Sequence, residues 1–152
     1  MNPLICTIIV WGGMHYATPK WMEKQIPDWM WSEYEILIAP YGTSLSVIDP
    51  TIDYETTALI GFSAGGIDVL KNYDSRYAFI GLIDPSTRPS FLNGTYDNAA
   101  IVYNPSVWGT TNKSLRPMAD RIKATGGDAE RVQLKHSDIP KYFFNKHFKQ
   151  HD

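Results

Sequence analysis

The chain has 152 residues, of which 43% are hydrophobic. This is enough apolar surface for one core, and the length is too short for two ordinary domains, so we expect a single domain over residues 1–152. The 14 basic and 16 acidic residues give a net charge of −2 and are interleaved along the chain. Because no long block of either sign occurs, the composition argues against binding to nucleic acid or to an anionic membrane.

The first apolar run covers residues 4–10 and contains the single cysteine, Cys6. One cysteine cannot form an intramolecular disulfide, which is typical of a reducing compartment, and we expect Cys6 to lie in the core. The run is too short to span a bilayer and lacks the positive flank of a signal peptide. The sequence therefore predicts a cytoplasmic protein, with residues 4–10 as a central strand.

Short apolar runs predict the strands of a sheet that is covered by helices on both faces. In chain order the predicted strands are residues 4–10, 35–39, 58–60, 77–83, 99–103 and 131–134. Helices are predicted after the Thr18-Pro19 cap as far as Pro27, from Ala64, between Ser114 and Gly126, and after Ser137 or Asp138. The crossover before the third strand and residues 85–98 are rich in turn residues and are expected to be loops.

Strands that alternate with helices imply a three-layer α/β domain with a mostly parallel sheet. Such sheets bind ligands at the carboxyl ends of their strands, so functional residues should lie just past the strand ends. Four places meet this condition: residues 12–14, Ser63, Asp84 together with Asn104, and His136.

Ser63 lies between a buried strand and a helix, in the run Gly61-Phe62-Ser63-Ala64-Gly65-Gly66. A serine on such a tight turn presents its hydroxyl at the sheet edge, where it can act as a nucleophile. The turn brings its flanking residues against neighbouring strands, and glycine avoids a clash there. The alternative interpretation is a glycine-rich turn that carries an incidental serine.

The order of these residues resembles the α/β-hydrolase family, in which a serine elbow comes first, an acid later and a histidine last. Ser63, Asp84 and His136 follow that order. The resemblance covers nearly the whole chain, which is short for the family and begins at the strand that usually comes third, without the leading hairpin. It implies a minimal α/β-hydrolase fold of about six strands in the order 2-1-3-4-5-6, with Ser63 at the switch point.

The resemblance also implies a role for each residue. A serine hydroxyl needs a base within hydrogen-bond reach, and a histidine can accept and return its proton. His136, just beyond the last predicted strand, is the expected base. His15 is the main alternative, and His147 and His151 are expected to be solvated.

The acid that orients the histidine is less well defined. In the family it most often follows a strand whose counterpart here ends in Asn104, and an amide in that role lowers turnover by roughly 10⁴. Asp84 ends the strand after the elbow helix, a position that some family members use, and is the expected acid. Asp138 lies close to His136 in sequence, which disfavours the usual geometry, but it stays an alternative.

Negative charge that develops on the substrate oxygen needs donors that already point at it. The resemblance implies the backbone N–H of Ala64 as one donor and that of Gly13 or Met14 as the other. Trp11 stands where many relatives have histidine. The aromatic residues expected to contact substrate, in a shallow and open cleft, are Trp11, Tyr16 and Trp108.

Together these residues predict a serine hydrolase that cleaves a small-molecule carboxylic ester or thioester through an acyl-enzyme. No metal or organic cofactor is expected, because the histidines and the single cysteine have no zinc-ligand spacing. Two alternatives stay open. An acyltransferase would use the same site with an alcohol or amine acceptor, and a non-catalytic protein of the same fold would only bind a ligand or partner, which Asn104 at the usual acid position would suit.

Overall fold

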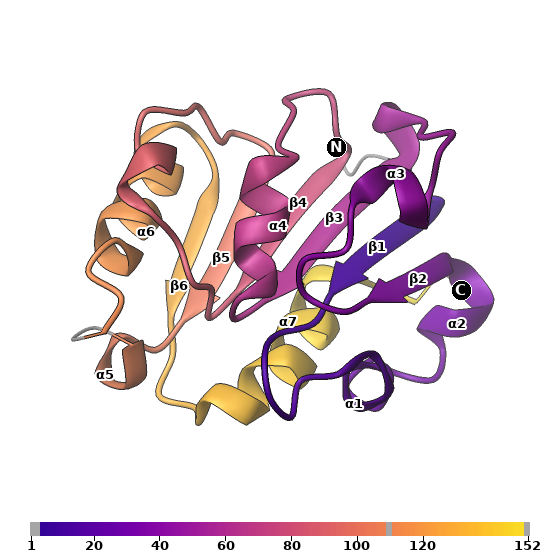
Figure 1. The fold of residues 1–152 in the computed structure, drawn as a ribbon, viewed down its shortest axis with the longest axis horizontal. Helices are drawn as coiled ribbons and strands as arrows, with labels where there is room; N and C mark the ends of the chain where they lie inside the picture. Colours follow the sequence, from indigo (N-terminus) through magenta and orange to yellow (C-terminus); the bar gives the residue numbers. More distant parts are fainter. Residues whose placement is uncertain (1–3, 109–110, 151–152) are drawn as a thin grey trace.

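A six-stranded sheet organises the chain in the computed structural model, which describes residues 4–108 and 111–150, without the side chains of Val107 and Trp108. The strand order is β2-β1-β3-β4-β5-β6, and each neighbouring pair is parallel (Figure 1). The predicted α/β class, the parallel sheet and the strand order are therefore confirmed.

The strands follow the predicted apolar runs, with differences at both ends of the chain. They are β1 (Thr7–Trp11), β2 (Glu35–Ala39), β3 (Thr57–Phe62), β4 (Phe79–Ile83), β5 (Ala99–Tyr103) and β6 (Asp128–Arg131). The prediction that β1 starts at residue 4 is wrong, and Cys6 just before it is exposed rather than in the core. The prediction of the last strand at residues 131–134 is also wrong. As an edge strand with one neighbour, β6 is only partly buried, so a polar segment forms it.

The helices are short. They are α1 (Pro19–Glu23), α2 (Met30–Glu33), α3 (Leu45–Ile48), α4 (Gly65–Lys71), α5 (Pro105–Trp108), α6 (Leu115–Ala124) and α7 (Ile139–His147), with 3₁₀ turns at Tyr54–Thr56, Pro89–Phe91 and His136–Asp138. Thr18 caps α1 as predicted, because its hydroxyl accepts a hydrogen bond from the N–H of Trp21, although α1 ends before Pro27. Within the described ranges, no helix combines the length and apolar character needed to cross a membrane.

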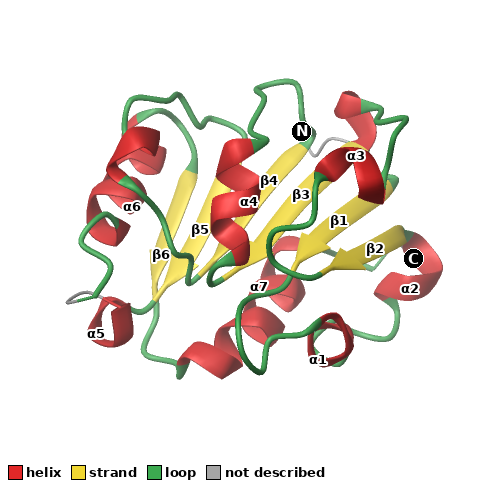
Figure 2. Ribbon diagram, viewed as in Figure 1, coloured by secondary structure: helices red, strands yellow, loops and turns green. Residues whose placement is uncertain are grey.

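Helices cover both faces of the sheet (Figure 2). Helices α1, α2 and α7 pack on the face that carries Ile8 and Ile60. Helices α4 and α6 pack on the opposite face, which carries Ile9 and Leu59. This alternation of neighbouring strand residues between two buried layers explains why the strands are apolar along their whole length. Because β1, β3, β4 and β5 are parallel neighbours, their carboxyl ends lie at one edge of the sheet.

Candidate active site

Ser63 lies directly after β3, where the chain turns into α4. Its φ of 56° is in the left-handed region that residues with a side chain rarely adopt. Its N–H donates to the carbonyl oxygen of Ile83 over 3.0 Å, and its carbonyl oxygen accepts from the N–H groups of Gly66 at 3.0 Å and Ser86 at 2.8 Å. The end of β4 and the loop that follows it therefore hold the turn in place.

Glycine is required beside this turn because backbone atoms pass very close. A methyl group at Gly61 would lie 2.3 Å from the carbonyl oxygen of Gly65. A methyl group at Gly65 would lie 2.4 Å from the carbonyl oxygen of Trp11. Both distances are far inside van der Waals contact, so a side chain at either position would push α4 away from the sheet.

Asp84 and His136 meet at the same edge of the sheet. Asp84 follows β4 directly, and His136 begins the 3₁₀ turn that leads into α7. Oδ2 of Asp84 lies 2.5 Å from Nδ1 of His136, and the two side chains are 0% and 17% exposed. A carboxylate at Nδ1 fixes the orientation of the ring and favours the tautomer in which Nε2 can accept a proton.

Backbone groups hold the carboxylate of Asp84 in this position. Asp84 has a φ of 38°, another left-handed conformation. Its N–H donates to the carbonyl oxygen of Val102 over 2.7 Å, and its Oδ1 accepts from the N–H of Asn104 over 2.9 Å. Each carboxylate oxygen therefore has its own donor, and the second oxygen is directed at His136.

A row of aromatic rings supports the imidazole, and the sequence analysis missed it. The ring of His136 stacks on that of Phe62, the residue before Ser63, with centroids 4.6 Å apart. Phe62 stacks in turn on Trp21 at 5.5 Å, and Trp21 meets Tyr16 edge-on at 5.0 Å. Alternation along β3 places Phe62 on the face of α1 and α7, but no sequence signal pairs its ring with His136.

The loop after β1 packs against the nucleophile turn. A methyl group at Gly13 would lie 3.1 Å from Cβ of Ser63 and 3.2 Å from the carbonyl oxygen of Phe62. Met14, the next residue, is 55% exposed. Ala64 precedes the first residue of α4, and backbone N–H groups at this end of a helix lack partners within the helix.

The predicted substrate contacts have different outcomes. Tyr16 is 49% exposed, and burial, followed by the charge of Asp84, raises the pKa of its hydroxyl above the ordinary value. The prediction for Trp11 is wrong, because its side chain is 0% exposed on the α4 face, where its indole N–H donates to the carbonyl oxygen of Thr43. The side chain of Trp108 lies outside the described part of the chain.

The other candidate acids and bases have different surroundings from those of Asp84 and His136. His15 is exposed in the loop after β1, and Asp138 is exposed at the N-cap of α7. The prediction that His147 is solvated is wrong, since it is half-buried between the rings of Phe143 and Phe79, with centroids at 4.5 and 5.7 Å. His151 lies outside the described residues.

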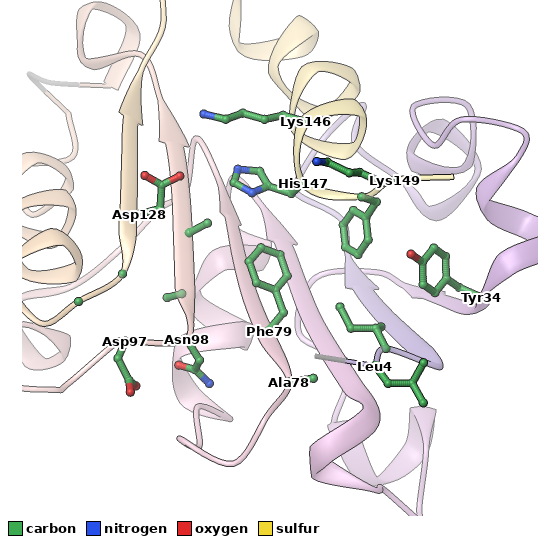
Figure 3. A pocket seen from close by; sticks show the side chains of 16 residues that line it. Leu4, Tyr34, Ala78, Phe79, Asp97, Asn98, Asp128, Lys146, His147 and Lys149 are labelled. Carbon is green, nitrogen blue, oxygen red and sulfur yellow. The ribbon is translucent and has the colours of Figure 1, made fainter. Parts of the chain in front are cut away.

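A cavity of about 540 Å³ lies at the opposite edge of the sheet, where strands β4, β5 and β6 begin (Figure 3). The side chains of Phe79, His147 and Phe148 line it, together with the lysines at the end of α7. None of Ser63, Asp84 and His136 lines this cavity. Its chemistry is therefore separate from that of the candidate site.

Comparisons with known proteins find distant structural likenesses. Neither a search of protein-family models nor a search of curated proteins finds a match. The propionate-bound structure of esterase Est2 from Thermogutta terrifontis is 10% identical over 86% of this chain and 72% of the esterase, with a TM-score of 0.49. Its apo form is 12% identical over 93% of this chain and 80% of the esterase, also at 0.49. A short-chain flavodoxin associated with a non-canonical PDU bacterial microcompartment is 8% identical over 93% of this chain and 95% of the flavodoxin, with a TM-score of 0.42. All three TM-scores lie below 0.5, so these likenesses indicate no function.

Proposed function

We propose that the protein is a serine hydrolase that cleaves carboxylic esters or thioesters. The observation that carries this proposal is the 2.5 Å contact between the buried carboxylate of Asp84 and Nδ1 of His136, at the sheet edge where Ser63 adopts its strained turn. A strained nucleophile turn, an imidazole and a buried carboxylate are the components that acyl transfer through a serine requires.

The proposed reaction has two stages, acylation of Ser63 and hydrolysis of the acyl-enzyme. Nε2 of His136 accepts the hydroxyl proton while Oγ of Ser63 attacks the carbonyl carbon, and the carboxylate of Asp84 stabilises the resulting imidazolium. The proton passes to the leaving alcohol or thiol when its bond to the acyl carbon breaks. Water then attacks the acyl-enzyme, with His136 again as the base, and releases the carboxylic acid and Ser63.

Backbone donors stabilise the oxyanion of each tetrahedral intermediate. We assign this role to the N–H of Ala64 and to the N–H of Gly13 or Met14, because the loop after β1 packs directly on Ser63. Such donors contribute roughly 3 kcal/mol each to the stabilisation of the transition state.

The rim of the site offers contacts to an apolar acyl group. Met14 and Tyr16 are large exposed side chains on the loop after β1, which packs on the nucleophile turn. Tyr16 is also near enough to Asp84 for that charge to contribute to the raised pKa of its hydroxyl. Their exposed surfaces provide apolar contacts to an acyl chain. We therefore assign Tyr16 a substrate-binding role.

Turnover of p-nitrophenyl acetate by the parent protein and by Ser63→Ala tests the proposal. Loss of the nucleophile should lower kcat by at least about 10³-fold. Ser86→Ala is the matched control, because Ser86 is a second serine at the same edge, bonded through its N–H to Ser63, and should keep most of the activity. A Ser63→Ala variant as active as the parent would contradict the assignment of the nucleophile.

Product analysis separates hydrolysis from acyl transfer. With butanol or an amine added as a competing acceptor, a hydrolase yields mostly the free acid, whereas an acyltransferase yields mostly the new ester or amide. A folded parent protein without any turnover would favour a binding role instead.

A further inference from the structure

Asn104, at a third strand end, contacts both Asp84 and the segment that leads to His136. It follows β5 directly, and its backbone N–H donates to Oδ1 of Asp84 over 2.9 Å. Its side-chain Nδ2 donates to the carbonyl oxygen of Leu134 over 2.8 Å. Leu134 lies two residues before His136. One residue therefore binds the carboxylate and the segment that carries the imidazole.

The contact with Leu134 extends beyond the end of sheet pairing. β6 ends at Arg131, and the N–H of Val132 still donates to the carbonyl oxygen of Tyr103 over 2.9 Å. Past that point the chain leaves the sheet toward His136, and the Asn104 amide binds it again at Leu134. The segment before His136 is therefore bound twice, at Val132 where it leaves the sheet and at Leu134 just beyond.

The contacts of Asn104 require an amide rather than a carboxylate. Its Oδ1 accepts a hydrogen bond from the N–H of Ser106 over 3.0 Å, which assigns the opposite end of the group, Nδ2, as the donor to Leu134. A carboxylate could not donate to a carbonyl oxygen and would add a second negative charge beside buried Asp84. An amide at position 104 therefore has its own chemical reason.

We propose that Asn104 is a positioning residue that sets both the direction of the Asp84 carboxylate and the place of the His136 ring. This inference rests on the proposed hydrolase function, because it assigns Asn104 a task in that reaction. Asn104 touches no reacting atom and acts through Asp84 and Leu134. Its backbone contact survives most substitutions, so side-chain variants isolate the contact with Leu134.

The test compares Asn104→Ala with Asn98→Ala in p-nitrophenyl acetate turnover. Asn98 is the matched control, because it lies directly before the first residue of β5, at the opposite end of the strand from Asn104. Its Nδ2 likewise donates to a backbone carbonyl oxygen, that of Tyr77, over 3.0 Å. Asn104→Ala should lower kcat about 10- to 100-fold with little change in KM, because a base displaced by a fraction of an ångström transfers the proton poorly. Asn98→Ala should leave kcat unchanged.

Asn104→Asp gives a readout that a purely structural role would not produce. It is isosteric, so it also serves if Asn104→Ala fails to fold, but a carboxylate cannot donate to the carbonyl oxygen of Leu134. Its kcat should therefore fall as in Asn104→Ala, with little change in KM. A role in packing alone predicts that the Asn104 and Asn98 variants lose activity only in proportion to their loss of stability.

An NMR measurement keeps the inference separate from the proposed function. The Nδ1–H proton of His136 should give a resolved downfield resonance in the parent protein and a broadened one in Asn104→Ala. If the parent lacks esterase activity but this resonance is lost in the variant, the proposed function fails and the positioning role stands. An unchanged resonance, or a folded Asn104→Ala with the parental kcat, overturns the positioning role.

Discussion

A half-buried histidine lies at each end of the sheet, and the two have different partners. At the carboxyl end, His136 meets the buried carboxylate of Asp84. At the amino end, His147 packs among aromatic rings, and its buried Nε2 has no hydrogen-bond partner within the described part of the chain. Burial, followed by the charge of Lys146, lowers the pKa of His147 below its ordinary value. The partners of a histidine, rather than its burial, distinguish a candidate base from a packing residue.

The two ends of the sheet also differ in backbone strain. Among the described residues, the non-glycine positions with positive φ are His15, Ser63 and Asp84, and each follows the carboxyl end of a strand. Strained residues persist only where the surrounding structure fixes them, and they cluster at functional sites. The strain is therefore concentrated at the end of the sheet that carries the proposed triad.

The largest effect that separates the two ends is expected from Asp84→Asn. The amide keeps the shape of the carboxylate but favours the wrong tautomer of His136, so kcat should fall by about 10⁴-fold. Asp128→Asn is the control, because Asp128 is an exposed carboxylate beside the cavity at the other end, and it should have the parental kcat. An Asp84→Asn variant with more than about a tenth of the parental activity would contradict the role of Asp84.

The next largest effect is expected from Gly61→Ala, which should reduce the stability of the fold. Its new methyl group would lie 2.3 Å from the carbonyl oxygen of Gly65, so the free energy of unfolding should fall by about 3 kcal/mol. Gly42→Ala is the control, since Gly42 has a φ of 89° and nothing within 4 Å of an added methyl group. It should lose only about 1 kcal/mol. Urea denaturation measures both values, and equal losses would show that the close approach at Gly61 is unimportant.

His147→Phe should have the smallest effect, confined to the pH dependence of stability. Because the folded protein lowers the pKa of His147, the unfolded chain binds its proton more readily, and stability is lost as the pH falls below the ordinary value of 6.5. The variant removes this proton-binding difference, so its Tm should fall less than that of the parent between pH 7.5 and 5.

Thermal denaturation across that pH range checks the expectation. Asn145→Phe is the control, because Asn145 is an exposed residue of α7 without a titratable side chain, and its replacement should leave the pH dependence unchanged. Parallel Tm curves for the parent and His147→Phe would contradict the account of the buried imidazole. Esterase activity should be unaffected by His147→Phe, since His147 lies at the end of the sheet away from Ser63.

Much of the fold followed from local patterns in the sequence. Apolar runs fully buried by helices identify β3, β4 and β5, and parallel strands necessarily bring their carboxyl ends to one edge. Ser63, Asp84 and His136 each follow a strand or the segment after it, so their common edge could be predicted. That Asp84, rather than Asn104, contacts His136 agrees with the preference for an acid in this role.

Other features of the fold and the site depend on tertiary contacts that leave no local pattern in the sequence. The face on which Trp11 lies depends on the register of β1, and the polar strand β6 forms only because β5 supplies its hydrogen-bond partners. The stacking of Phe62 on His136 and the contact of Asn104 with Leu134 join residues far apart in the chain. Similarly, the sequence near the C-terminus predicts a solvated His147, and only the packing of α7 on the sheet buries it.

Mapping the adduct of a fluorophosphonate probe shows directly whether Ser63 is the nucleophile. The parent protein is incubated with the probe, digested, and analysed by peptide mass spectrometry. We expect a single adduct on Oγ of Ser63, formed far more slowly in Asp84→Asn. An adduct on another serine, or a folded protein that takes up no probe, would contradict this expectation.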